Sequence, residues 1–126
     1  TVHQDLQNVF YAALNTELID ITVIEGRRTK ERQDQLFEDG KSKVKWPRGK
    51  HNVLDPNDHA KAVEAAPYVN GISWDWKHCI FLAGVVLATA EIMDVKIRWG
   101  GNWDMDGEIL TDQTFDDRPH FELVTA

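Results

Sequence analysis

Hydrophobic side chains recur at helical spacing in three parts of the chain. In residues 3–16, five apolar positions line one face: Leu6, Val9, Phe10, Ala13 and Leu14. A second helix begins after Thr29, which can cap it, runs to Asp39 and stops at Gly40. Residues 76–94 form the longest apolar helix, and its core candidates are Ile80, Phe81, Leu87 and Ile92. The pattern therefore predicts three helices.

Four shorter stretches have the composition of β-strands. Residues 19–25 are rich in β-branched side chains, and residues 95–99 and 120–124 form two further short strands. Residues 61–66 form another, which ends at Pro67 and sends Ala62, Glu64 and Ala66 to one face. Polar loops at residues 41–59 and 100–114 complete the pattern. Because helices alternate with short strands joined mostly by loops, we expect an α+β fold with a small antiparallel sheet and flanking helices.

The composition is typical of one globular domain. With 126 residues, 42% hydrophobic and 28% charged, the chain can bury a core, and no linker or repeat divides residues 1–126. No run approaches the roughly 20 apolar residues of a membrane helix, and residues 1–5 lack the features of a signal peptide. We therefore expect a protein that is made in the cytoplasm and does not insert into membranes. The single cysteine, Cys79, excludes an internal disulfide and a zinc site built from several thiols.

Charge is distributed unevenly along the chain. Residues 27–50 hold nine of the fourteen basic residues and four acidic ones, so that segment carries +5 and the remainder −12, for a net charge of −7. A basic face on an acidic body can meet an anionic polymer such as nucleic acid or cell wall, or can be an ordinary solvated surface. Nothing else in the sequence favours nucleic acid, so we expect no nucleic-acid partner.

Two histidines and a glutamate stand where site residues are expected. His51 lies in the polar loop before the strand that carries Glu64, and His120 begins the last strand behind an acidic turn. Two histidines and a carboxylate from different elements can bind zinc and leave its fourth position for water. His59 is also close to Glu64 in sequence, but five residues along a strand would place the two on opposite faces.

The order of several short motifs is more specific than this residue count. Residues 26–33, 49–52, 62–68, 99–103 and 117–122 read GRRTKERQ, GKHN, AVEAAPY, WGGNW and DRPHFE. This order resembles the zinc D-Ala-D-Ala carboxypeptidase family and, within it, the single-domain phage endolysins that act as L-alanyl-D-glutamate peptidases. The resemblance extends over residues 3–124. It implies a hedgehog/D-Ala-D-Ala peptidase-like zinc fold with no separate cell-wall-binding domain.

The resemblance also implies a role for each matching residue. The positions of the family's zinc ligands fall on His51, Glu64 and His120. Asp117 matches the catalytic base, and Arg28 matches an arginine that binds substrate or stabilises its oxyanion. Gln33 lies in the same motif as Arg28 and is a second candidate for binding substrate. Residues three apart on a regular strand face opposite ways, so Asp117 and His120 can share a site only if the chain turns between them.

Three features depart from the family pattern. Gly49 stands where the family usually has serine, and thirteen residues separate His51 from Glu64, more than in the compact motif. Glu64 stands in place of aspartate, and its extra methylene moves the carboxylate by more than about 1 Å unless the backbone compensates. A zinc-binding module with impaired catalysis is therefore an alternative to an active enzyme.

A calcium site is a further possibility in the loop after residue 101. Oxygen-bearing side chains stand at suitable intervals at Asn102, Asp104, Asp106 and Asp112. Gly107 occupies the sixth position of such a loop, but Gln113 replaces the glutamate of the twelfth. An ordinary acidic surface turn would have the same residues, so a calcium site and a turn without a metal both stay open.

Together these implications describe a zinc-dependent peptidoglycan peptidase of a phage or prophage, which cuts the peptide stem between L-Ala and D-Glu during host lysis. D-Ala-D-Ala carboxypeptidase or dipeptidase activity shares the motifs and stays an alternative. We expect the partner to be stem peptides of peptidoglycan, and the chain to be a monomer, since a lysin must diffuse through a mesh. It would wait in the host cytoplasm until the membrane is permeabilised.

Overall fold

The computed structural model of the chain describes residues 2–42, 44, 46, 48–53, 58–102, 105 and 117–124. In this part of the chain the helices are α1 (Gln4–Asn15), α2 (Lys30–Glu38) and α3 (Trp76–Ile92). The strands are β1 (Asp20–Glu25), β2 (Ala62–Tyr68), β3 (Ile97–Trp99) and β4 (His120–Leu123). The four strands form one antiparallel sheet in the order β1-β2-β4-β3. The expected α+β fold with a small antiparallel sheet is confirmed.

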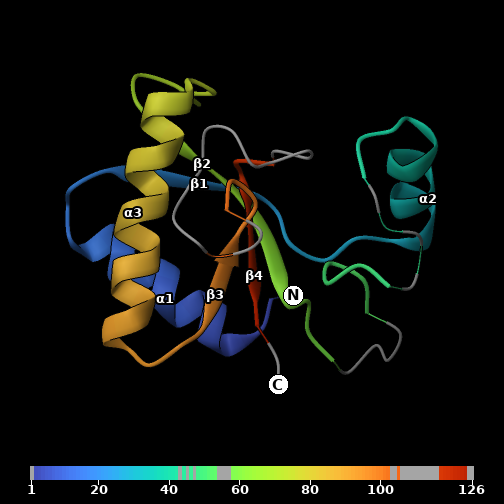
Figure 1. Cartoon of the computed structure of the whole chain (residues 1–126), viewed down its shortest axis with the longest axis horizontal. Coiled ribbons are helices and arrows are strands. Elements are labelled where there is room, and N and C mark those ends of the chain that lie inside the picture. The colour runs from blue at the N-terminus through green and yellow to red at the C-terminus, as the bar shows by residue number, and fades with distance from the viewer. Residues whose placement is uncertain are drawn as a thin grey trace.

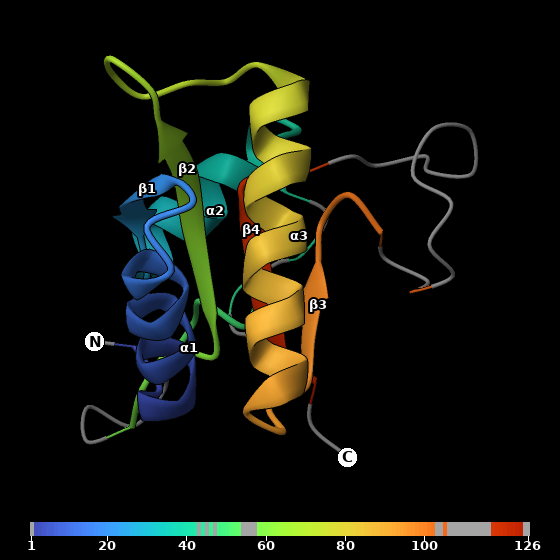
Figure 2. The ribbon, with the colours of Figure 1, turned by 90° about the vertical axis from the view of Figure 1, so that its left-hand side faces the viewer.

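The two faces of the sheet have different surroundings. Helices α1 and α3 lie side by side against one face, whereas α2 lies on the opposite side of the sheet (Figures 1 and 2). Alternation along β2 and β4 sends Val63, Ala65, Phe121 and Leu123 into the core beneath the two helices. Glu64, His120 and Glu122 occupy the alternate positions of these strands, so their side chains lie on the opposite face of the sheet.

Local signals explain where the helices begin. The Thr29 hydroxyl accepts a hydrogen bond from the Arg32 backbone N–H at 3.1 Å, and the Asp75 carboxylate accepts one from Lys77 at 2.8 Å. Such side-chain caps satisfy backbone donors that the first turn of a helix leaves unpaired. The cap at Thr29 fixes the start of α2 at Lys30, two residues after Arg28.

The prediction that Pro67 ends the second strand is wrong, because β2 continues through Pro67 to Tyr68. The backbone nitrogens of residues 63, 65 and 67 point towards β4, as the bond from Ala65 N–H to the Pro119 carbonyl shows. Pairing between β2 and β4 covers only residues 62–64 of β2. Among the described residues, no strand pairs with that side of β2 at Pro67, and there the missing N–H costs no ladder hydrogen bond.

Two of the core candidates on the longest helix are also wrong. Phe81 is 50% exposed and Ile92 is 86% exposed, whereas Ile80 and Leu87 are partly buried against the core. The buried side chains of α3 are small or medium in size: Cys79, Leu82, Ala83, Val85, Val86 and Ala90. At 3.6 residues per turn, Phe81 and Ile92 lie on the side of the helix opposite to all of these except Val85. Because apolar residues occur on all sides of α3, their spacing in the sequence does not indicate which face is buried.

Within the part of the chain that is described, no helix combines the length and apolar character needed to cross a membrane.

Candidate metal centre

The site is assembled from one loop and two paired strands. Glu64 and His120 are direct cross-strand partners in the β2–β4 pair, so their side chains leave the sheet next to each other. His51 comes from the loop between α2 and β2. That loop is held in place by the bonds from Arg28 N–H to the His51 carbonyl and from Lys61 N–H to the Lys50 carbonyl, both 2.8 Å.

Three ligand atoms converge in the resulting cluster. The His51 Nε2 atom lies 3.2 Å from Glu64 Oε1 and 3.2 Å from His120 Nδ1, and His120 Nδ1 lies 3.0 Å from Glu64 Oε1. The three residues are buried, with 2%, 8% and 7% of their surface exposed for His51, Glu64 and His120. The structure thus brings together the two histidines and the glutamate that the sequence singles out, in an arrangement that can hold a metal ion.

Hydrogen bonds on the outer nitrogens determine which ring atoms face the cluster. His51 Nδ1 lies 2.7 Å from the Gly26 carbonyl, which only accepts, so this nitrogen carries the proton. His120 Nε2 lies 2.8 Å from Glu122 Oε1 and donates to that carboxylate in the same way. In the neutral rings, the lone pairs of His51 Nε2 and His120 Nδ1 therefore point at the carboxylate oxygen of Glu64.

Such a convergence of three electron pairs requires a cation. The triangle edges of 3.0–3.2 Å are close to the separation of about 3.4 Å between the ligand atoms of a tetrahedral zinc ion. The outer hydrogen bonds to a carbonyl and a carboxylate are the usual way in which proteins orient metal-binding histidines. The donor set and its geometry therefore fit zinc.

Without a metal, a proton takes the place of the cation. Burial lowers the pKa of His120, but hydrogen bonds with Glu122 and Glu64 outweigh it and raise the pKa to about 9. Burial raises the pKa of Glu64, but hydrogen bonds with His120 and His51 bring it down to about 2. The metal-free centre at neutral pH is thus a buried carboxylate paired with a protonated imidazole.

Arg28 lies on the edge of the cluster. Its guanidinium donates to Glu25 Oε1 at 2.5 Å, to Gln33 Oε1 at 3.2 Å and to Glu64 Oε1 at 3.3 Å. The Arg28 side chain is 12% exposed, so a cation is held at a partly open rim beside the ligand oxygen. A guanidinium in this position can attract a carboxylate or an oxyanion of a bound molecule.

Gln33 lies beneath Arg28 and is fully buried. Its amide donates to the Ser42 hydroxyl at 2.9 Å and to the Val44 carbonyl at 2.5 Å, and its oxygen accepts from Arg28 and from Asn52. Contact with a ligand would require these bonds to break. The geometry places Gln33 where it supports Arg28 and the loop that carries His51.

The chain makes a turn just before β4. Such a turn is required if Asp117 and His120 are to belong to one site. The His120 N–H donates to the Asp117 carbonyl at 3.1 Å, which closes a tight turn through Arg118 and Pro119. Gly100 pairs with both ends of this turn, through bonds of 2.8 Å to His120 and 3.0 Å to Asp117. The negative charge of Asp117 also contributes to the raised pKa of His120.

Asn52 fills the space beside Gly49, where the family pattern has serine. A Cβ atom at Gly49 would lie 2.8 Å from Asn52 Oδ1 and 3.3 Å from Gln33 Oε1. The Asn52 amide accepts from the Gly49 N–H at 3.0 Å and donates to Gln33 at 3.2 Å. In this chain the side chain of Asn52 therefore makes the polar contacts near the ligand loop, and glycine leaves room for it.

Other sequence candidates lie elsewhere or outside the described residues. His59 is exposed and is not part of the cluster. In the proposed calcium loop, Asn102 is described, whereas Asp104, Asp106 and Asp112 lie outside the described residues.

Sequence reasoning missed the groups that support the cluster. Glu122 bonds to His120, and the carbonyl of Gly26 bonds to His51. The position of Glu122 could have been predicted from the sequence. It lies two residues after His120 on a strand, so the two side chains must lie on the same face of the sheet. The contact of the Gly26 carbonyl with His51 could not have been predicted, because every residue has a backbone carbonyl and the sequence does not show which one bonds to the ring.

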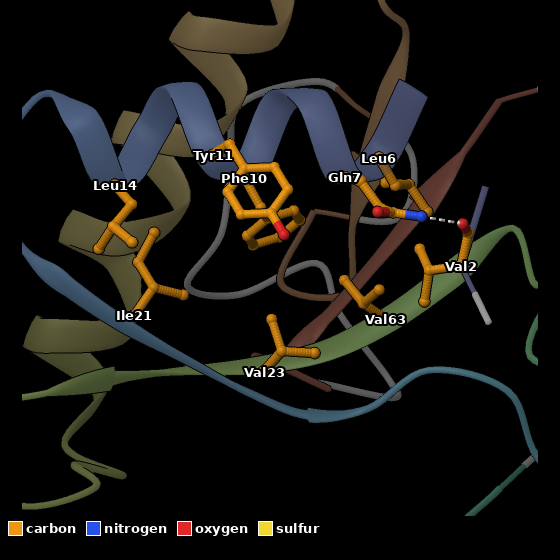
Figure 3. Close-up of a pocket in the computed structure, with 9 residues that line it drawn as sticks. All are labelled: Val2, Leu6, Gln7, Phe10, Tyr11, Leu14, Ile21, Val23 and Val63. Atoms are coloured by element: carbon orange, nitrogen blue, oxygen red, sulfur yellow. Dashed lines mark hydrogen bonds between the residues drawn. The ribbon is translucent and has the colours of Figure 1, made fainter. Parts of the chain in front are cut away.

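An apolar hollow on the other face of the sheet is separate from this centre. Figure 3 shows it between α1 and β1, with Tyr11 and Leu14 on the helix opposite Ile21 and Val23 on the strand. Its lining is apolar apart from Gln7, whose amide donates to the Val2 carbonyl at 2.7 Å, and the Tyr11 hydroxyl. Among the described residues that line it there is no histidine, carboxylate, thiol or amine.

Comparisons with known proteins agree on one family. The sequence profile of the family described as phage L-alanyl-D-glutamate peptidase matches residues 1–124. The L-alanyl-D-glutamate peptidase of Escherichia phage T5 is 31% identical over 130 residues, which cover 98% of this chain and 90% of that protein. The crystal structure of the Serratia marcescens L-Ala D-Glu endopeptidase ChiX superimposes with a TM-score of 0.78 at 30% identity, covering 98% of this chain and 80% of that one.

Proposed function

The chain belongs to the phage L-alanyl-D-glutamate peptidase family, and from this premise we propose that it is a zinc-dependent endolysin that hydrolyses the L-Ala–D-Glu bond of peptidoglycan stems. The observation that carries the zinc assignment is the buried triangle of His51, Glu64 and His120, in which three electron pairs face one point. The bond assignment rests on the family.

Zinc held by these three residues would acidify a bound water towards a pKa of about 7 and polarise the scissile carbonyl. Proton transfer and substrate binding depend on other side chains of the protein. Asp117 is the proposed base, because the turn at residues 117–120 ties its backbone to that of the ligand His120 and its negative charge acts on this histidine. It would take a proton from the attacking water and pass it to the departing amine of D-Glu.

Arg28 is the proposed group for the substrate's negative charge. Its guanidinium is held beside Glu64 by Glu25 and Gln33 and keeps a partly open side. There it can bind a stem carboxylate or the oxyanion that develops on the carbonyl, and a preformed donor is most effective against charge that appears in the transition state. Gln33 would act through Arg28 by fixing the plane of the guanidinium.

The digestion of purified Gram-negative peptidoglycan tests this function. Zinc-loaded protein, protein stripped with chelator and stripped protein restored with zinc are compared, and the released fragments are identified by mass spectrometry. We expect stem peptides that begin at D-Glu from the first and third samples only.

Other products would point to the alternatives. Loss of terminal D-Ala alone would contradict the bond assignment and indicate a carboxypeptidase. Bound zinc with no fragments would contradict hydrolysis and indicate a zinc-binding module with impaired catalysis. Cleavage that is unaffected by chelation would contradict the zinc assignment.

A further inference from the structure

Glu122 is a buried carboxylate next to the metal centre that takes no part in the proposed reaction. It is 6% exposed and lies two residues after His120 on β4, so both side chains leave the same face of the sheet. Its Oε1 atom accepts a hydrogen bond from His120 Nε2 at 2.8 Å. Its Oε2 atom accepts from Arg98 at 2.8 Å and lies 3.2 Å from the Lys50 ammonium.

The bond to Glu122 constrains how His120 can bind a metal. An imidazole can present either nitrogen, and it can rotate about its bond to the backbone. An acceptor on Nε2 keeps the proton there and turns Nδ1 towards His51 and Glu64. For His51 the Gly26 carbonyl has the same effect from the backbone. Glu122 is thus the side chain that selects the nitrogen His120 presents.

Two cations from different elements hold Glu122 in place. Arg98 comes from β3, and Lys50 comes from the loop that carries His51. Lys50 also donates to the Leu123 carbonyl, so the loop is attached to β4 directly beside His51. A buried carboxylate is costly unless it is paired, and here each of its oxygens has a partner. The same carboxylate therefore orients one histidine ligand and anchors the loop of the other.

We propose that Glu122 is a positioning residue of the metal centre, which fixes His120 with Nδ1 towards the metal and couples it to the His51 loop through Lys50. This inference rests on the proposed function only in that the cluster of His51, Glu64 and His120 binds zinc. Glu122 touches neither the metal nor the substrate in this scheme, and its effect passes through the two histidines.

The zinc affinity of the full chain tests the proposal, measured by competition with a chromophoric chelator. Glu122→Ala removes the acceptor for His120 and should weaken zinc binding by about 10–100-fold. Glu122→Gln keeps an oxygen that can accept from Nε2 and should retain affinity between that of the parent and that of the alanine variant. The glutamine variant also keeps the shape of the side chain, so it remains informative if the alanine variant does not fold.

Arg98→Met is the matched control. It removes one cation from Glu122 but leaves the bond between Glu122 and His120, and we expect its zinc affinity to stay within about threefold of the parent, as for a partly exposed ion pair. A loss equal to that of Glu122→Ala would show that the ion cluster matters only for stability and would overturn the proposal.

A second measurement reports the ring itself. In the zinc-loaded parent, the long-range proton–nitrogen NMR spectrum of His120 should show the proton on Nε2 alone, and Glu122→Ala should show a second tautomer or an exchanging ring. A parent that binds zinc and an alanine variant with the same affinity and the same spectrum would overturn the role of Glu122 and leave the proposed function intact. A parent that binds no zinc would overturn both.

Discussion

Glu64 Oε1 is the atom on which the metal centre converges. It lies 3.0 Å from His120 Nδ1, 3.2 Å from His51 Nε2 and 3.3 Å from the Arg28 guanidinium. The longer side chain of glutamate is therefore accommodated by the positions of the two histidines, although the family pattern has aspartate here. The departure seen in the sequence does not by itself indicate a damaged site.

Glu64→Asp should consequently lower activity. On the same backbone the shorter side chain would withdraw the ligand oxygen by more than about 1 Å, and displacements of that size can cost about 100-fold in rate. The value of kcat/KM on a purified muropeptide checks this. An increase in kcat/KM would mean that Glu64 impairs the enzyme and that aspartate restores it.

The proton on His120 predicts how zinc binding depends on pH. With a pKa of about 9, His120 is protonated in the metal-free protein at pH 7.5, and zinc must displace that proton from Nδ1. We expect between about one and two protons to be released per zinc bound at this pH, one from His120 and part of another from the zinc-bound water. Calorimetric titrations in buffers with different ionisation enthalpies measure this number, and a value near zero would contradict the account.

The same group makes the metal-free protein less stable at alkaline pH. Because the pKa of His120 is raised from 6.5 in the folded state, its contribution to stability is complete below about pH 6.5 and is lost as the pH rises through about 9. The pKa values of Glu64 and Glu122 are both about 2, so those carboxylates do not titrate in this window. Urea unfolding of stripped protein at pH 6, 7.5 and 9 should show decreasing stability, and an increase would be inconsistent with the charged pair.

At the level of elements, the turn before β4 depends on its close contact with Gly100. A Cβ atom at Gly100 would lie 2.0 Å from the Asp117 carbonyl oxygen, which is part of the backbone and cannot rotate away. The absence of a side chain thus lets residues 117–120 run beside the end of β3. This contact sets the position of Asp117 relative to His120.

Gly100→Ala should therefore displace the turn, with a loss of about 1–3 kcal/mol of stability and a larger proportional loss of activity. Gly84→Ala is a matched control, because a Cβ atom there would meet nothing within 4 Å and alanine favours the helix by up to about 1 kcal/mol. Thermal melts and muropeptide hydrolysis distinguish the two. Full activity in Gly100→Ala would refute the role given to the turn.

The elements themselves were largely predictable from the sequence. Helical spacing of Leu6, Val9 and Phe10 located α1, and the β-branched run located β1. The end of β2 was missed because the effect of Pro67 depends on whether a neighbouring strand needs its N–H, and this is a property of the sheet. Phe81 and Ile92 were assigned to the core because α3 is apolar on all sides, so periodicity could not identify its buried face.

For the whole molecule, the sequence could identify the candidate ligands but could not supply the reason they fit a metal. The residues His51, Glu64 and His120 followed from motif order and from the resemblance to a family. Their lone pairs face one point because of Gly26, which lies 25 residues before His51, and Glu122, which lies two residues after His120 on β4. The single-domain organisation, the monomeric state and the residence in the host cytoplasm stay predictions, as does the calcium loop.

In the proposed zinc centre, three atoms hold the metal: His51 Nε2, Glu64 Oε1 and His120 Nδ1. Anomalous diffraction at the zinc absorption edge, from crystals of the zinc-loaded protein, tests it most directly. We expect one strong anomalous peak about 2.0–2.2 Å from each of these atoms. A peak bound through His120 Nε2 or His51 Nδ1, or the absence of any peak between the three residues, would contradict it.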